Sequence, residues 1–222
     1  MAGYRFDFHG AALEARGSGA LWWAARRVLV VSDLHLGKSA RMARRGGALL
    51  PPYEGRETLH RLEAEIRATD AACVICLGDS FDDLDAVALP EDEAEWLARL
   101  MAGRDWIWIE GNHDPAPIAP GGRNAAELRL DGLVLRHIAR PDARAEISGH
   151  YHPKARLAGQ SRPAFLLDGA RVILPAFGAY TGGLDATDPA LQDLMGATAR
   201  AVLTGPAALV MPLPRPARAR RG

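Results

Sequence analysis

The 222-residue sequence predicts an α/β fold with a strand-rich second half. Two observations support this prediction. In the first half, short apolar runs alternate with segments whose apolar residues recur at helical spacing, which is typical of parallel βαβ units. In the second half, short apolar runs follow one another through tight turns. A composition of 48% hydrophobic and 24% charged residues is that of an ordinary globular domain.

Three apolar runs in the first half are predicted to be buried strands: residues 28–31, 73–77 and 106–109. Between them, the sequence predicts helices over residues 57–69 and 91–101. In the first helix, apolar residues three and four positions apart form one face. The second helix begins with several acids, which suit the positive end of a helix dipole.

The second half begins with a predicted hairpin. Residues 128–130 and 133–135 are its strands, because Asp131-Gly132 between them is a favoured two-residue turn. Two further strands are predicted at residues 145–148 and 172–174.

Charge is unevenly distributed along the chain. Residues 215–222 contain four arginines and no acid, so we expect a disordered basic tail after a single domain over residues 1–214. The whole chain has 27 basic and 27 acidic residues, which leaves 23 basic and 27 acidic residues in that domain, a net charge of −4. This domain lacks the basic footprint of many nucleic-acid-binding proteins.

The sequence predicts a cytoplasmic protein without a membrane segment. No apolar run approaches the ~18 residues of a membrane helix, and no signal-peptide pattern is present. Cys73 and Cys76 are the only cysteines, which excludes a disulfide scaffold.

The two cysteines lie three residues apart in a predicted strand, so their side chains point to opposite faces of the sheet. We therefore expect them to be core residues rather than a zinc or redox pair. Trp106 and Trp108 are likewise predicted to pack in the strand layer.

Residues that bind metals follow four of the predicted strands directly. In open α/β sheets, ligands bind beyond the carboxyl ends of the strands, so we expect these side chains to meet at one edge. They are Asp33 and His35, Asp79, Asn112 and His113, and His150 and His152.

Carboxylate, imidazole and amide ligands without thiolates suit manganese, iron or zinc. Seven ligands are too many for one tetrahedral ion. They suit two ions about 3.5–4 Å apart, an arrangement used in phosphoryl hydrolysis. The sequence therefore predicts a two-metal hydrolase.

The order of the motifs D-x-H, G-D-x-x-D, G-N-H-D and G-H-x-H resembles the calcineurin-like metallophosphoesterases. This resemblance implies two packed mixed β-sheets flanked by helices, a four-layer α/β sandwich. It also implies two metal sites. Asp33, His35 and His152 would hold one metal, Asn112, His137 and His150 the other, and Asp79 would bridge both.

The resemblance calls for one more histidine between the third and last motifs, and His137 is the only one between His113 and His150. The superfamily often has glycine after this histidine, whereas this chain has Ile138. The resemblance also implies that His113 protonates or stabilises the leaving oxygen, and that Asp82 orients His113.

A more specific resemblance extends over residues 4–190. Besides the metal motifs, it includes Arg45-Gly46-Gly47 and the segment from Leu174 to Gly183, with Tyr180-Thr181-Gly182-Gly183 at its end. These features are similar to the bacterial ligase-associated DNA damage response endonucleases, the PdeM family. The resemblance implies a manganese-dependent phosphodiesterase acting on single-stranded DNA, with helicase and ligase partners in repair. It also favours a place for the 180–183 segment at the site, where the pattern alone reads as a plain turn.

Two other functions remain open from the residues. One is a phosphoesterase for a small nucleotide or pyrophosphate, and the other is a non-catalytic scaffold on the same fold. Lys38, Arg41, Arg44 and Arg45 follow the first metal motif, and the arginines share a face if the segment is helical. They could bind flanking phosphates of DNA, or they could form a solvated charged loop.

Overall fold

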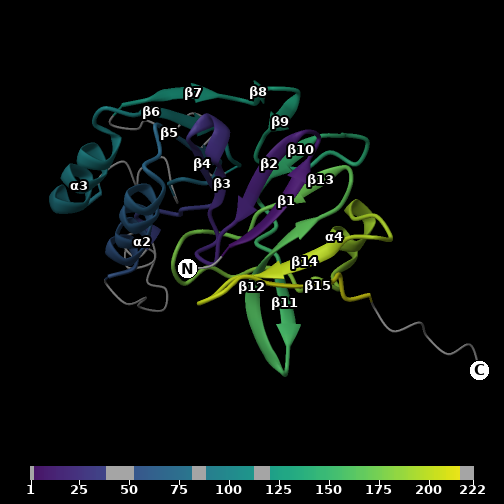
Figure 1. Ribbon diagram of the computed structural model, residues 1–222. Coiled ribbons are helices and arrows are strands. Elements are labelled where there is room, and N and C mark those ends of the chain that lie inside the picture. The colour runs from purple at the N-terminus through teal and green to yellow at the C-terminus, as the bar shows by residue number, and fades with distance from the viewer. Residues whose placement is uncertain (1–2, 39–52, 82–88, 113–120, 216–222) are drawn as a thin grey trace, which may run out of the picture.

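The computed structural model describes residues 3–38, 53–81, 89–112 and 121–215. Two β-sheets stack face to face, and helices cover their outer faces (Figure 1). One apolar cluster lies between the sheets, since it includes residues such as Val30 and Ile107 from the first sheet and Phe165 and Val172 from the second. The four-layer α/β sandwich predicted from the sequence is confirmed.

The first sheet has seven strands in the order in which they occur along the chain. Its first four strands pair antiparallel, and its last four pair parallel. The strands are β1 (Tyr4–Phe8), β2 (Ala11–Ala15), β3 (Leu21–Trp23), β4 (Val28–Val31), β5 (Cys73–Leu77), β6 (Asp105–Ile109) and β7 (Arg123–Ala125). Helices α2 (Glu54–Thr69) and α3 (Glu91–Met101) cover its outer face, and a short 3-10 helix, η1 (Ala24–Arg26), joins β3 to β4.

The second sheet has the order β15-β14-β12-β13-β10-β9-β8, and β11 pairs with β12 outside this path. Strands β9, β10 and β13 are parallel, and the other pairs are antiparallel. The strands are β8 (Leu128–Leu130), β9 (Leu133–Leu135), β10 (Glu146–Ser148), β11 (Lys154–Leu157), β12 (Gln160–Leu167), β13 (Arg171–Ile173), β14 (Arg200–Leu203) and β15 (Leu209–Pro212). The short helix α4 (Pro189–Leu194) packs on its outer face.

The predicted strands and helices of the first half are confirmed, with α2 beginning three residues earlier than expected. In β4, Val28 and Val30 face the second sheet, whereas Leu29 and Val31 face the helices. Both faces of this strand are therefore buried, which explains its continuous apolar sequence.

The predicted hairpin is confirmed as β8 and β9. Strand β10 begins one residue later than predicted, and β13 begins and ends one residue earlier. Cys73 and Cys76 are free thiols that pack toward opposite faces of the first sheet, as expected. Cys73 is only half-buried, because it opens β5 at the rim of the sheet. Trp106 and Trp108 are buried under the helices, which confirms their predicted core role.

Residues 216–222 of the predicted tail lie outside the described residues. Arg215, at its start, donates hydrogen bonds to the Gln192 side chain and to the carbonyls of Met195 and Gly196. Among the described helices, none combines the length and apolar character needed to cross a lipid bilayer.

Candidate metal centre

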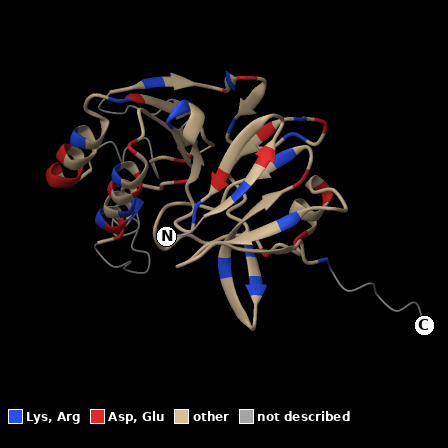
Figure 2. Ribbon diagram, viewed as in Figure 1, with Lys and Arg blue, Asp and Glu red and all other residues tan. Residues whose placement is uncertain are grey.

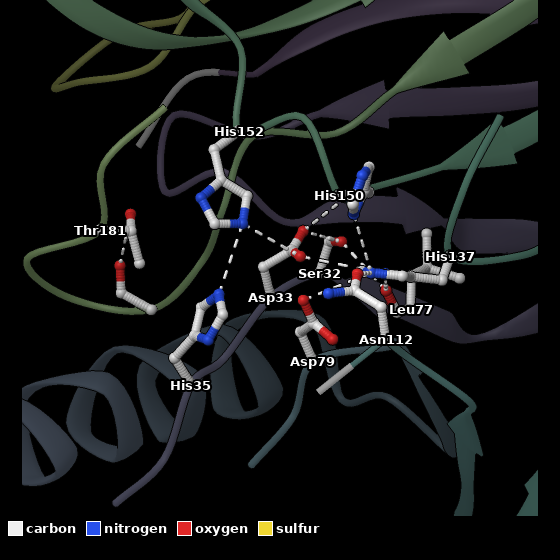
Figure 3. Close-up of polar contacts among 11 residues, drawn as sticks. Ser32, Asp33, His35, Leu77, Asp79, Asn112, His137, His150, His152 and Thr181 are labelled. Carbon is white, nitrogen blue, oxygen red and sulfur yellow. Dashed lines mark hydrogen bonds and ion pairs between the residues drawn. The ribbon is translucent and has the colours of Figure 1, made fainter. Parts of the chain in front are cut away.

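The carboxyl ends of β4, β5, β6, β9 and β10 meet where the edges of the two sheets come together. Two groups of potential metal-binding residues lie there, side by side (Figure 3). The first group is Asp33, His35 and His152, and the second is Asp79, His137 and His150. Each group therefore joins a carboxylate from the first sheet to at least one histidine from the second.

In the first group, Asp33 and His35 follow β4, and His152 lies between β10 and β11. Nε2 of His152 is 3.1 Å from Oδ1 of Asp33 and 3.4 Å from Nε2 of His35. The Asp33 side chain is fully buried. The group thus brings one carboxylate oxygen and two ring nitrogens to a common point.

In the second group, Asp79 follows β5, His137 follows β9 and His150 follows β10. Nε2 of His137 lies 3.4 Å from Oδ2 of Asp79 and 3.2 Å from Nδ1 of His150. Oδ1 of Asn112, directly beyond β6, is 2.9 Å from the same nitrogen. The Asn112 side chain therefore lies next to His137 of the second group, where the family resemblance would place it.

The backbone of both groups is held in an unusual conformation. Positive φ values between 45° and 72° occur at five of these residues: Asp33, His35, Asp79, His150 and His152. Left-handed backbone costs on the order of 1 kcal/mol or more for a non-glycine residue and is concentrated at functional sites. Glycine is required at position 78, because a Cβ there would collide with the His137 ring. The turn before Asp79 therefore packs directly against His137.

Hydrogen bonds fix which atoms face the common points. Nδ1 of His137 lies 2.8 Å from the carbonyl oxygen of Leu77. Because a carbonyl only accepts, Nδ1 carries a proton, so in the neutral ring the lone pair of Nε2 lies on the side of Asp79 and Asn112. Oδ2 of Asp33 accepts from the Ser32 hydroxyl and the His150 amide, whereas the buried Oδ1 accepts no hydrogen bond among the described residues.

This arrangement fits cations. Nδ1 of His150 and Oδ1 of Asn112 both lie within 3.2 Å of Nε2 of His137, so a cation bound among them would accept a lone pair from each. A metal–nitrogen bond of about 2.0–2.1 Å places neighbouring ligands about 3.0–3.4 Å apart, close to the separations seen here. Carboxylate, imidazole and amide donors without a thiolate suit manganese, iron or zinc.

The electrostatics of the groups agree with this fit. Burial opposes ionisation of Asp33, but pairing with His152 and His137 outweighs it and holds the pKa of the carboxyl below its usual value. Burial also opposes protonation of His137, but Asp79 and Asp33 outweigh it and raise the pKa of this ring. Burial and the neighbouring His137 lower the pKa of His150. The buried carboxylates therefore favour positive charge at both centres.

A cavity of about 730 Å³ opens beside the second group. Asn112 and His137 form the side nearest the metal ligands, and Ile138 and Arg140 line it further out. Ile138, the residue where the superfamily often has glycine, is 42% exposed. Arg136 also lines the cavity, but its charge is paired with Glu127 and Glu146. The cavity therefore opens onto Asn112 and His137 of the second group.

Some residues predicted from the sequence cannot be placed. Asp82, His113, Arg41, Arg44 and Arg45 lie outside the described residues. Lys38 is described, and its Nζ donates a hydrogen bond of 3.3 Å to the carbonyl of Tyr180. Sequence reasoning missed the supporting roles of Ser32 and the Leu77 carbonyl. A serine next to the first motif is a weak signal, and a backbone carbonyl leaves none in the sequence.

Comparison with known proteins agrees with the geometry. Residues 26–170 match the family model described as calcineurin-like phosphoesterase. The chain is similar to the crystal structure of the Pseudomonas putida nuclease MPE, with a TM-score of 0.76 and 29% sequence identity. That similarity covers 94% of this chain and 100% of the nuclease chain. A search of curated proteins gives no match. Since the family match spans more than half of the sequence and encloses both ligand groups, the chain belongs to the calcineurin-like phosphoesterase family of metal-dependent hydrolases.

Proposed function

We propose that this protein is a two-metal phosphodiesterase that hydrolyses DNA, acting in the cytoplasm as a manganese-dependent single-strand endonuclease in DNA repair. The pair of adjacent ligand groups carries the proposal. The structural similarity to a nuclease supports a nucleic-acid substrate. Helicase and ligase proteins of the same repair pathway are proposed as partners.

The proposed ligands divide into two sets that share Asp79. Asp33, His35 and His152 form one set, and Asn112, His137 and His150 form the other. Two divalent cations bound there would neutralise phosphate oxygens and acidify a water molecule between them. Manganese is our first choice, and iron or zinc would also suit these donors.

The remaining steps fall to side chains and backbone groups of the protein. The Leu77 carbonyl holds the ring of His137 in one tautomer, so that its free nitrogen stays aimed at the second set. The Ser32 hydroxyl and the His150 amide engage one oxygen of Asp33, so that the other oxygen faces His152. His113, the next residue after Asn112, is proposed to protonate the leaving oxygen, with Asp82 orienting its ring.

Binding of DNA requires positive charge close to the ligands. Basic and acidic residues are interspersed over the helices and the first sheet, whereas the projecting β11–β12 hairpin carries basic residues only (Figure 2). Lys38, which follows His35 by three residues, is proposed to contact phosphates together with Arg41, Arg44 and Arg45. Replacing the three arginines should raise the KM for DNA and flatten its salt dependence. An unchanged salt slope would show that they only form a solvated charged loop.

Circular single-stranded DNA gives the sharpest test. The purified protein is incubated with this circle and Mn²⁺, and products are separated on a denaturing gel. A circle has no end, so linear fragments would establish endonuclease action. Protein treated with a chelator is the matched control.

A small nucleotide substrate is the second candidate, because the cavity beside Asn112 and His137 is large enough for one nucleotide. An intact circle together with hydrolysis of an aryl phosphodiester or a cyclic nucleotide would support this alternative and contradict the endonuclease proposal.

A further inference from the structure

The only two lysines in the sequence converge on one loop. Nζ of Lys38 donates to the carbonyl of Tyr180 at 3.3 Å, and Nζ of Lys154 donates to the carbonyl of Thr181 at 3.1 Å. Each lysine follows a residue of the first ligand group, since Lys38 lies three residues after His35 and Lys154 two residues after His152. Both amines are thereby tied to the segment that flanks this group.

This loop, residues 178–183, is anchored at both ends to the segments that carry the first ligand group. The Gly178 amide donates to the Asp33 carbonyl at 3.1 Å, and just beyond the loop the Leu184 amide donates to the Tyr151 carbonyl at 3.2 Å. Thr181 is seen on the side of His35 and His152 in Figure 3. The position of the loop relative to these histidines is therefore fixed.

The anchored loop presents an exposed aromatic residue. Tyr180 is 60% exposed, although it lies between two residues whose backbones are held in place. Its φ of 54° is in the left-handed region, which a bulky residue adopts at a cost. Neither burial of the ring nor backbone preference accounts for a tyrosine here. Contact with another molecule would account for it.

The two lysines also have hydrogen-bond donors that are not used within the loop contacts. An ammonium group has three donors, and one carbonyl uses only one of them. Within the described part of the chain, neither lysine forms an ion pair with a carboxylate, whereas Arg136 and Arg156 do. Two half-buried positive charges of this kind, close to a phosphoesterase site, are suited to phosphate groups.

We propose that Tyr180 is the platform on which a nucleobase next to the scissile phosphate stacks, and that Lys38 and Lys154 hold phosphates on either side of that base. This inference rests on the proposed function and specifies how the substrate is held beside the first ligand group. Base–aromatic stacking is sequence-tolerant, because every base presents a π-face. It therefore suits an enzyme that acts on single strands of any sequence.

Two substrates of equal length and charge separate stacking from phosphate binding. One is oligo(dA), and the other is an abasic deoxyribose-phosphate chain. The enzymes are the wild type and three variants, Tyr180→Phe, Tyr180→Leu and Tyr180→Ala, compared by kcat/KM with Mn²⁺. Melting temperature and bound metal are measured on each protein, since a purely structural residue would change those instead.

We expect Tyr180→Ala and Tyr180→Leu to lower kcat/KM on oligo(dA) about tenfold and to cost much less on the abasic chain. Tyr180→Phe keeps a π-face and should retain the wild-type preference for oligo(dA). Equal losses on both chains, or no loss on either, would overturn the stacking role.

The lysines are tested by salt dependence. Replacing both, as Lys38→Met with Lys154→Met, should reduce the slope of log KM against log salt by about 0.7 for each phosphate that is no longer neutralised. Arg156→Met on the same hairpin strand is the matched control, because Asp185 already pairs with this charge. A lower melting temperature with an unchanged slope would show that the lysines only anchor the loop. Failure of the wild type to cleave oligo(dA) at all would instead contradict the proposed function itself.

Discussion

The two ligand groups are built in different ways. The first group draws Asp33 and His35 from a single turn after β4 and adds His152, and an anchored loop with two lysines flanks it. The second group takes Asp79, Asn112, His137 and His150 from the ends of four strands and borders the large cavity. The first is compact and buried around one carboxylate, whereas the second is assembled from separate segments and is open on one side.

This difference teaches how the fold divides the work of the site. A group made from one turn and one loop keeps its shape as long as these segments stay paired. Both groups need the two sheets docked, but the second depends on four separate strand ends, and its Asn112 is exposed. We therefore expect the first group to hold the substrate in position. We expect metal binding at the second group to be more sensitive to single substitutions.

Asp79→Ala should have the largest effect, because Asp79 is the proposed ligand common to both groups. Phosphodiesterase activity should fall by about a thousandfold or more, and bound metal should fall toward zero. Metal content is measured by elemental analysis and activity with an aryl phosphodiester. Asp193→Ala, at an exposed position on α4, is the control. Loss of only one metal would show that Asp79 does not bridge.

His113→Ala should separate chemistry from metal binding. As the proposed proton donor, His113 should contribute about a hundredfold to ten-thousandfold to turnover. Both metals should remain bound, since Asn112 and the other proposed ligands are unchanged. A variant that loses metal together with activity would place His113 among the ligands and contradict its proposed role.

His137→Ala should lower bound metal from two ions to one and reduce activity about a hundredfold, which tests the sensitivity of the second group directly. The Leu77 carbonyl would lose its donor, and Asn112 would lose its neighbour. His60→Ala, at an exposed position on α2, is the matched control. Full activity with two metals would remove His137 from the site despite its position.

Ser32→Ala should weaken the first group more than the second, because the Ser32 hydroxyl bonds Asp33 directly and reaches the Leu77 carbonyl only at 3.3 Å. It removes a hydrogen bond to Oδ2 of Asp33, while the His150 amide continues to donate to that oxygen. Removal of such a supporting hydrogen bond typically lowers metal affinity about 10- to 100-fold. Titration with Mn²⁺ should show one weakened site, with Ser161→Ala as an exposed control. Equal weakening of both sites would contradict the separation of the two groups.

Much of the site could be predicted from the sequence, because parallel strands place their carboxyl ends at one edge. Asp33, Asp79 and Asn112 each follow a short apolar run, so their convergence followed from fold class alone. The choice of His137 rested on its order in the chain. Its tautomer and its contact with the Leu77 carbonyl depend on tertiary structure and leave no sequence pattern.

The parts of the fold that escaped prediction have a physical reason as well. Strand β1 lies at the edge of the first sheet and is mostly half-exposed, so its apolar pattern is weak. The start of β13 was missed because Arg171 is charged. It is buried beside Glu146 in the paired register of β10 and β13, and this ion pair replaces the apolar contact that a strand pattern would show.

Helices α2 and α3 provide no residue to either ligand group. A substitution there should therefore have the smallest effect on the site, and its effect on stability should not depend on metal. Glu93 on α3 is 6% exposed, and burial is the main cause that raises the pKa of its carboxyl. Asp92 and, more weakly, Glu54 add to this rise, and Arg56 opposes it. A raised folded-state pKa means that this acid stabilises the fold when it is neutral, and that the contribution is lost as pH rises through that pKa. Glu93→Gln stays neutral, so it should melt about 2–4 °C higher than the wild type near pH 7 and no higher near pH 4. Thermal unfolding of both proteins across this pH range, with a chelator and separately with Mn²⁺, measures the difference. A gain that persists at pH 4, or that appears only with Mn²⁺, would link this helix to the metal centre and break the contrast between the scaffold and the two ligand groups.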